Sequence, residues 1–194
     1  MRDRPASRGA QGWAVWVSGR PGSGKTTIVS MLRARLIGRG IPVVVLEVAE
    51  FATAIAPGGV PSAKQRAIIT RAVIQAAKLL TDAGRAVLID GAVPHRESGR
   101  VARELITNFA HVELACPLDL CRDRERAVRW NLVACPQAPY PMAAPDLGLE
   151  YDAAVDADLT LYTDAVGEWT AAEEVLRLAD RLERAACERR RSCA

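Results

Sequence analysis

Short apolar runs alternate along this chain with longer segments of helical periodicity. The run VVVL at 43–46 has no polar alternation, which is typical of a strand buried on both faces of a parallel sheet. Strands are predicted at 14–18, 43–46, 86–89, 111–115 and 159–162. Helices are predicted at 25–37, 62–83, 97–109, 118–129 and 171–185. This alternation predicts an α/β fold, a three-layer α/β/α sandwich around a parallel sheet.

The longest of the early helices, 62–83, has an apolar face that we expect to be buried. Its inward-facing residues are predicted to be Ile68, Ile69, Val73, Ala76, Leu79 and Leu80.

Helical periodicity stops in the segment 130–148, which contains prolines at 136, 139, 141 and 145. Because a long loop inside a compact domain is usually functional, we expect a lid at about 130–148. We find no second domain boundary and predict one domain over 12–185, with flexible tails at 1–11 and 186–194.

The composition narrows the class of protein. With 49% hydrophobic residues in 194, the chain is not expected to be disordered. The formal net charge is +3, but the two tails carry that excess and leave the body slightly negative, so we expect no nucleic-acid partner. We see no membrane-spanning or export segment and expect a cytoplasmic protein. Five cysteines without C-x-x-C spacing indicate neither a disulfide framework nor a zinc site.

One motif decides the chemistry. Residues 19–26 read GRPGSGKT, which fits G-x-x-x-x-G-K-[ST] in full, directly after a predicted strand and before a predicted helix. Glycines let backbone N–H groups converge on phosphate oxygens, and the helix N-terminus adds unpaired donors and partial positive charge. The motif therefore predicts a P-loop fold that binds a nucleoside triphosphate with Mg²⁺. The predicted nucleotide-binding residues are Gly19, Pro21, Gly22, Ser23, Gly24, Lys25, Thr26 and Thr27.

Lys25 is expected to reach the β- and γ-phosphates, and the Thr26 hydroxyl to ligate Mg²⁺. Asp90 follows the apolar run VLI and has the form of a Walker B acid, a second candidate for the metal. Glu47 ends another strand and Glu50 follows it; either could accept a proton from a substrate hydroxyl, and Glu47 is our first choice. The alternative for all three acids is a capping or solvated loop carboxylate.

Four arginines, 122, 124, 126 and 129, precede the proline-rich segment. Residues spaced by two do not share one helix face, so two or three at most can point into a cleft. We expect Arg124 to close over the nucleotide and the others to form an exposed charged face.

These residues resemble the adenylylsulfate (APS) kinase family, P-loop enzymes that use ATP to phosphorylate the 3′-hydroxyl of adenosine 5′-phosphosulfate. VWVSGRPGSGKTT resembles the family's opening strand and loop, and AAKLLTDAGRAVLI its second helix and third strand. VELACPLDLCRDRE is similar to the family's strand and C-x-x-R-D helix, with Arg124 at the arginine position, and PHR at 94–96 falls where the family has P-Y-R. The resemblance implies a kinase and a possible homodimer.

The chain departs from the family pattern at the acceptor end. Where the family has D-G-D-x-x-R, this chain has EVAEFA at 47–52, which puts Glu47, Ala49 and Ala52 at the two acids and the arginine. Arg66 is kept from the family's D-R-x-x-N-x-x-R, but Ile69 replaces the asparagine. Losing an arginine and hydrogen-bonding groups weakens binding of an anionic substrate. These changes suggest a less anionic acceptor.

The resulting hypothesis is an ATP-dependent kinase whose acceptor is a small hydroxylated molecule, not or not only adenosine 5′-phosphosulfate. The predicted catalytic residues are Lys25, Glu47, Asp90 and Arg124, with Thr26 and Asp90 at the metal. The predicted acceptor-binding residues are Glu50, Phe51, Arg66, Arg71, His95 and Arg96. The alternatives are a genuine adenylylsulfate kinase and, because Ala49 lacks the family's carboxylate, a non-catalytic ATP-binding regulator.

Overall fold

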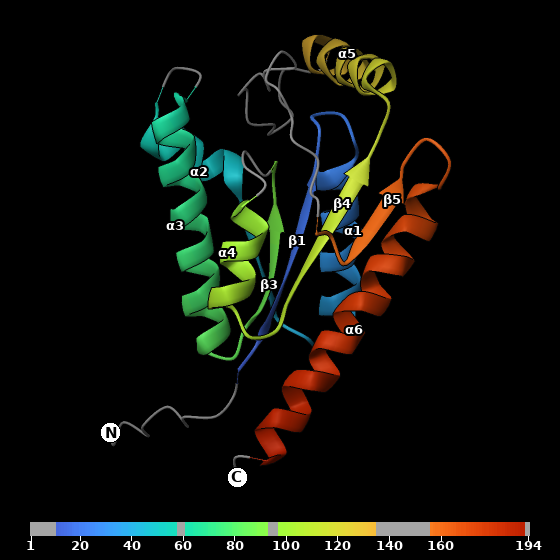
Figure 1. The fold of residues 1–194 in the computed structure, drawn as a ribbon. Helices are drawn as coiled ribbons and strands as arrows, with labels where there is room; N and C mark the ends of the chain where they lie inside the picture. Colours follow the sequence, from blue (N-terminus) through green and yellow to red (C-terminus); the bar gives the residue numbers. More distant parts are fainter. Residues whose placement is uncertain (1–10, 58–60, 93–96, 135–155, 193–194) are drawn as a thin grey trace.

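Five parallel strands form the sheet in the order β2-β3-β1-β4-β5, with helices on both faces (Figure 1). The computed structural model describes residues 11–57, 61–92, 97–134 and 156–192. The strands are β1 (Trp13–Gly19), β2 (Val43–Glu47), β3 (Ala86–Asp90), β4 (Phe109–Ala115) and β5 (Leu159–Tyr162). The helices are α1 (Lys25–Gly38), α2 (Val48–Ile55), α3 (Ala63–Asp82), α4 (Glu97–Leu105), α5 (Leu118–Ala134) and α6 (Glu168–Ser192).

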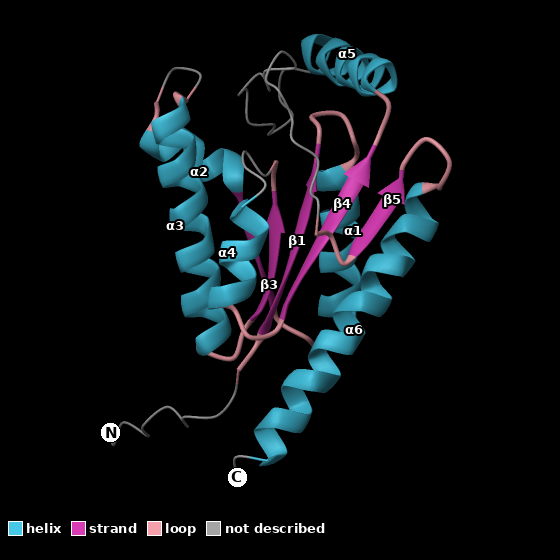
Figure 2. Cartoon of the chain, viewed as in Figure 1, coloured by secondary structure: helices cyan, strands magenta, loops and turns pink. Residues whose placement is uncertain are grey.

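Helices lie on both sides of the strands (Figure 2), and two apolar clusters hold the three layers together. Alternate side chains of β1 point to opposite faces of the sheet. Trp13, Val15 and Val17 join α1 and α6 in one cluster, and Ala14 and Trp16 join α3 and α4 in the other. The predicted α/β/α sandwich is confirmed. Because all five strands are parallel, their carboxyl ends meet at one edge, where ligands of open α/β sheets bind.

Several predicted boundaries were wrong. The helix expected at 97–109 ends at Leu105, and β4 begins at Phe109. Asn108 is not part of the helix because it is hydrogen-bonded to Gly12 and Ala14 at the start of β1. The helix expected at 171–185 runs from Glu168 to Ser192, so most of the expected C-terminal tail is helical, with Ala186 buried against the core. The helix α5 continues to Ala134, into the start of the expected lid.

The helix α2 was not predicted, and the expected inward face of α3 was partly wrong. The side chains of Ile68 and Leu79 are 54% and 61% exposed, whereas Ile69, Val73 and Ile74 form the buried stripe. The helix α3 starts at a capping box, in which the Ser62 hydroxyl accepts from the Gln65 backbone N–H and the Gln65 side chain accepts from the Ser62 N–H. The rest of the predicted lid, from 135, lies outside the described residues.

Candidate active site

The phosphate loop connects the end of β1 to the start of α1. Gly24 is the N-cap residue of α1 and has φ of 99°, in the left-handed region that glycine favours. Gly22 also has a positive φ, and a Cβ there would stand 2.3 Å from the carbonyl oxygen of Cys121 in α5. The sequence therefore needs glycine at Gly22 for two reasons, the turn and the close approach of α5.

The polar groups of this loop are arranged to receive a ligand. The Ser23 Oγ is buried and has no hydrogen-bond partner among the described residues. Lys25 Nζ donates to the Arg20 carbonyl at 2.8 Å, which folds its ammonium group back over the loop. Burial lowers the pKa of Lys25, and the nearby charges of Asp90 and Glu125 oppose this shift.

Asp90 ends β3 and meets the first turn of α1. Its carboxylate accepts a hydrogen bond from the Thr26 hydroxyl, and only 7% of the residue is exposed. Burial raises the pKa of Asp90, and the Thr26 bond and the charge of Lys25 limit that rise. The strand end is fixed at Gly91, whose carbonyl accepts from Trp16 Nε1 at 3.0 Å. This places an acid and a hydroxyl together at the phosphate loop.

Glu47 lies beside Asp90 at the same edge of the sheet. The two residues are register partners on β2 and β3, and Glu47 is also the N-cap residue of α2, although its side chain makes no capping bond. Burial raises the pKa of Glu47, and the charges of Glu50 and Asp90 raise it further. The carboxyl end of β2 thus places a half-buried carboxylate beside Asp90.

Arg124 connects α5 to the loop after β5. One guanidinium nitrogen donates to the Thr163 carbonyl at 2.8 Å, and the other lies 3.3 Å from the Thr163 hydroxyl and 3.6 Å from Cys116 Sγ. These contacts anchor the loop at 163–167, which lines the cleft. In this structure Arg124 acts on the cleft wall through Thr163.

A polar chain of side chains crosses from β1 to β4 on the α4 side of the sheet. The Ser18 hydroxyl lies 2.6 Å from Glu113 Oε2 and 2.7 Å from His111 Nε2. Because a carboxylate only accepts, Ser18 donates to Glu113 and the His111 Nε2–H donates to Ser18. Burial lowers the pKa of His111 to about 4, so the imidazole is neutral at neutral pH.

A cleft of about 940 Å³ opens over the carboxyl edge of the sheet. It is within the range of pockets that bind nucleotides and drug-sized ligands. Its wall includes the following predicted site residues: Pro21, Gly22, Ser23, Gly24, Lys25, Thr26, Thr27, Glu47, Asp90 and Arg124. Gly19 lies just below, as the last residue of β1.

Four predicted acceptor residues do not reach the cleft wall. Phe51 packs against the apolar cluster under α3, and the Arg66 guanidinium donates to the Pro61 carbonyl at 2.7 Å. Arg71 is exposed on α3, and Glu50 is exposed in the first turn of α2. Phe51, Arg66, Arg71 and Glu50 therefore do not line the cleft in this structure, and their part in acceptor binding stays a prediction. His95 and Arg96 lie outside the described residues.

The cleft also contains residues that the sequence reasoning missed. Glu125 lines it beside Arg124, and the loop from Thr163 to Gly167 forms much of the wall near α6. That loop follows the carboxyl end of β5, so the rule that ligands bind at strand ends could have found it. Within the described part of the chain, no cluster of three or more His, Cys, Asp or Glu residues has the geometry of a metal site.

No helix in the described ranges is both long and apolar enough to cross a bilayer.

The cleft at the end of a parallel sheet and the phosphate loop that enters it define a P-loop protein. The model of the family described as Adenylylsulphate kinase matches residues 11–131, and the chain belongs to that family.

Known relatives agree with the assignment. The chain is 35% identical over 115 residues to the adenylyl-sulfate kinase of Microcystis aeruginosa, a match that covers 59% of this chain and 64% of that protein. The chain thus spans less than two thirds of the length of that relative. A longer match, 26% identical over 179 residues, covers 90% of this chain and 87% of the adenylyl-sulfate kinase of Thermodesulfovibrio yellowstonii.

Solved structures share the fold. The Mycobacterium tuberculosis APS kinase CysC, in complex with AMPPNP and APS, matches with a TM-score of 0.69 and 25% identity, over 88% of this chain and 98% of that one. The structure of APE1195 matches with a TM-score of 0.72 at 21% identity, over 89% of this chain and 97% of that one, a likeness of fold alone.

Proposed function

We propose that this protein is an ATP-dependent kinase that transfers the γ-phosphate of ATP to a hydroxyl group of a small molecule. The observation that carries the proposal is the meeting of Lys25, Thr26 and Asp90 at the carboxyl edge of the sheet. Phosphoryl transfer depends mainly on positioning and on charge stabilisation, and these three groups supply both.

The residues present suit ATP with Mg²⁺. The buried, unpartnered Ser23 Oγ and the N-terminus of α1 offer donors to phosphate oxygens, and Lys25 offers a positive charge. Thr26 and Asp90 would hold the metal, which neutralises the charge of the phosphates when it is bound. The similar APS kinase structure in complex with AMPPNP supports an ATP-like ligand for this chain.

Glu47 is proposed as the base. Its carboxylate stands beside Asp90 at the end of β2, and β3 separates β2 from β1, the strand that leads into the phosphate loop. An acceptor hydroxyl would approach the γ-phosphate at this place. Burial and neighbouring carboxylates raise the pKa of Glu47, which brings it closer to the operating pH of a general base. Arg124 is proposed to act by holding the Thr163 loop against the nucleotide.

The acceptor is proposed to differ from adenosine 5′-phosphosulfate, or to include other alcohols. Ala49 lines the cleft where the family pattern has a carboxylate, and Ala52 and Ile69 remove an arginine and an asparagine. The second candidate is a genuine adenylylsulfate kinase. The family match and the named adenylyl-sulfate kinase relatives favour it.

One experiment separates these functions. Purified protein is incubated with Mg·ATP and adenosine 5′-phosphosulfate, and the 3′-phosphorylated product is followed by mass spectrometry. Turnover identifies an adenylylsulfate kinase. ATP binding without product, followed by turnover of other alcohols, supports the changed acceptor. ATP binding without turnover of any alcohol indicates a regulator. Sedimentation of the same sample tests the homodimer that the resemblance implies.

A further inference from the structure

Two cysteines lie at the junction of β4 and α5, the helix that packs against the phosphate loop. Cys116 directly follows β4, and Cys121 lies in the first turn of α5. The Cys121 Sγ stands 3.9 Å from the Cys116 carbonyl oxygen, and the two thiols are within hydrogen-bonding reach of each other. A pair of neighbouring thiols is therefore built into this junction.

The backbone between the two cysteines brings them together. The Cys121 N–H donates to the Pro117 carbonyl at 3.0 Å, so the first turn of α5 carries Cys121 back over the end of β4. Cys116 is partly exposed, whereas Cys121 is fully buried. A reagent in solution therefore meets Cys116 first, and Cys121 is placed to react with Cys116 from the inside.

The backbone of Cys121 lies directly against the phosphate loop. A Cβ built on Gly22 would stand 2.3 Å from the Cys121 carbonyl oxygen and 3.0 Å from the Cys121 Cα. This contact leaves no room between the two segments. A displacement of Cys121 must therefore be taken up by the loop that we expect to hold the phosphates.

The Cys116 sulfur contacts the residue that holds the other wall of the cleft. One Arg124 nitrogen lies 3.6 Å from Cys116 Sγ and 3.3 Å from the Thr163 hydroxyl, and the other donates to the Thr163 carbonyl at 2.8 Å. Thr163 lines the cleft. The thiol pair thus touches the cleft on two sides, at the phosphate loop through Cys121 and at Arg124 through Cys116.

We propose that Cys116 and Cys121 form a reversible disulfide, and that this bond weakens nucleotide binding in the cleft. The proposal rests on the nucleotide-binding part of the function proposed above. A disulfide holds its two sulfur atoms about 2.0 Å apart, so the thiols must approach each other. Because β4 and the fixed φ of Pro117 restrain Cys116, much of the movement falls on the start of α5. That movement shifts the Cys121 carbonyl against Gly22 and changes the sulfur contact of Arg124.

The oxidant is a small disulfide, such as oxidised glutathione. The Cys116 sulfur, after loss of its proton, attacks one sulfur of the reagent, and one reduced thiol leaves as the reagent S–S bond breaks. The deprotonated Cys121 sulfur then attacks the Cys116 sulfur, forms the protein disulfide and releases the second reduced thiol. The two released thiols carry away the two protons and two electrons that the protein loses. A reducing thiol reverses both steps.

The coupling between the disulfide and the nucleotide is reciprocal. If the disulfide lowers the affinity for the nucleotide by some factor, a bound nucleotide favours the dithiol form by the same factor. This reciprocity can be measured without any phosphate transfer. The proposal can therefore be tested separately from the kinase reaction.

The full-length protein is equilibrated with mixtures of reduced and oxidised glutathione, with and without saturating Mg·AMPPNP, and is then unfolded in an alkylating reagent. Trypsin releases residues 104–122 as one peptide, which contains Cys116, Cys121 and no other cysteine. The disulfide form of this peptide carries no alkyl group and lacks two hydrogen atoms relative to the dithiol. Calorimetry measures the Kd of Mg·AMPPNP for the reduced and the oxidised protein.

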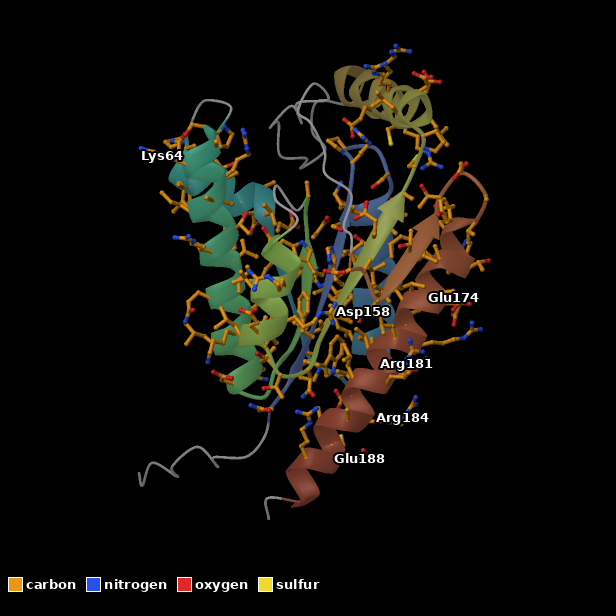
Figure 3. All side chains as sticks on the ribbon, in the orientation of Figure 1. Lys64, Asp158, Glu174, Arg181, Arg184 and Glu188 are labelled. Carbon is orange, nitrogen blue, oxygen red and sulfur yellow. The ribbon has the colours of Figure 1, made fainter. Side chains whose placement is uncertain are left out.

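Two variants and a control accompany the wild type. Cys116→Ser cannot form the bond but keeps an atom that accepts from Arg124, and Cys121→Ala removes the other thiol. The matched control is Cys187→Ser, next to Glu188 on α6, at the far end of the molecule from α5 (Figure 3). It removes a cysteine that contacts neither wall of the cleft.

We expect the disulfide form to bind Mg·AMPPNP roughly fivefold or more weakly than the dithiol form, and a reducing thiol to restore the affinity. Saturating Mg·AMPPNP should shift the glutathione ratio at half oxidation by the same factor. The Kd of Cys116→Ser and of Cys121→Ala should not respond to glutathione, and that of Cys187→Ser should respond like the wild type.

A 104–122 peptide that never forms the internal disulfide in the native protein overturns the proposal. A disulfide that leaves the Kd unchanged overturns it as well. A reduced protein that binds Mg·AMPPNP but phosphorylates no alcohol contradicts the kinase function alone, and the two Kd values still decide the redox proposal. A reduced protein that binds no Mg·AMPPNP overturns both.

Discussion

Glu47 and Asp90 are register partners at the carboxyl ends of the adjacent parallel strands β2 and β3. Neighbouring strands lie about 4.8 Å apart, and register partners point to the same face, so the two carboxylates share one end of the cleft. Asp90 is tied to the phosphate loop through Thr26, whereas Glu47 is not. The two neighbouring carboxylates therefore have different surroundings, which fits the metal role proposed for Asp90 and the proton role proposed for Glu47.

Replacing Asp90 with Asn should lower turnover at least about 100-fold, because the carboxylate that joins Thr26 in holding the metal is lost. The fold should survive, since burial already disfavours the charged form of this residue. The measurements are steady-state kinetics over a range of Mg²⁺ concentrations and urea unfolding. If this variant has wild-type kinetics, Asp90 is not part of the active site.

Replacing Glu47 with Gln should lower kcat about 100-fold while the affinity for ATP stays within about twofold of wild type. The amide keeps the shape of the side chain and cannot accept the acceptor proton. Single-turnover kinetics together with calorimetric binding of AMPPNP separate the two effects. The control is Glu104→Gln, at an exposed ion pair with Arg100 on α4, which should leave both values unchanged. Loss of nucleotide affinity in the Glu47 variant would contradict its assignment as base.

The layers and strands of the fold follow from local signals, because continuous apolar runs and helical spacing are both visible in the sequence. The buried stripe of α3 was harder to predict, since apolar residues occur nearly all round that helix and the sheet decides which of them it covers. The helix α2 was missed because VAEFATAI is apolar and short, and its start is set by the end of β2.

The phosphate loop and Asp90 could be predicted from the sequence because a motif and a strand end fix them. The contact of Arg66 with the Pro61 carbonyl could not be predicted, because it depends on how the chain enters α3. The role of Arg124 in holding Thr163 also depends on a contact between segments far apart in sequence. Tertiary contacts of this kind leave no local pattern.

Replacing Gly22 with Ala should prevent nucleotide binding and destabilise the protein by more than about 1 kcal/mol. The new Cβ would meet the Cys121 carbonyl at 2.3 Å, and the backbone there has a positive φ. The matched control is Gly38→Ala at the end of α1, where no atom lies within 4 Å of the new Cβ. Chemical unfolding and AMPPNP calorimetry test both variants. A Gly22 variant as stable as the Gly38 variant would show that the close approach is not important.

Replacing Arg124 with Lys should raise KM for ATP roughly three- to tenfold with a smaller change in kcat. Lysine keeps the charge but cannot span the Thr163 carbonyl and hydroxyl together. The control, Arg126→Lys, changes an exposed residue of the same helix that pairs with Asp123. Equal KM values in the two variants would exclude the anchoring role.

Stability should fall as the pH is lowered from 7.5 to 5, by about 2 kcal/mol from His111 alone. The folded-state pKa of His111 is lowered to about 4, from an ordinary value of 6.5, so the unfolded chain binds the proton more readily in this range. The stabilisation is complete above about pH 6.5 and is lost as the pH falls toward the folded-state value. Urea unfolding of wild type and His111→Gln should show a steeper pH dependence in the wild type.

The close approach of Cys121 to Gly22 makes the phosphate loop observable without a substrate. The Cys121 side chain is fully buried, and burial together with Cys116 raises the pKa of its thiol to about 12. A thiol in this state reacts with alkylating reagents only when the loop and the start of α5 separate. Its modification rate, read by peptide mass spectrometry, therefore measures the opening frequency of the loop. A bound nucleotide that closes the loop should slow that rate.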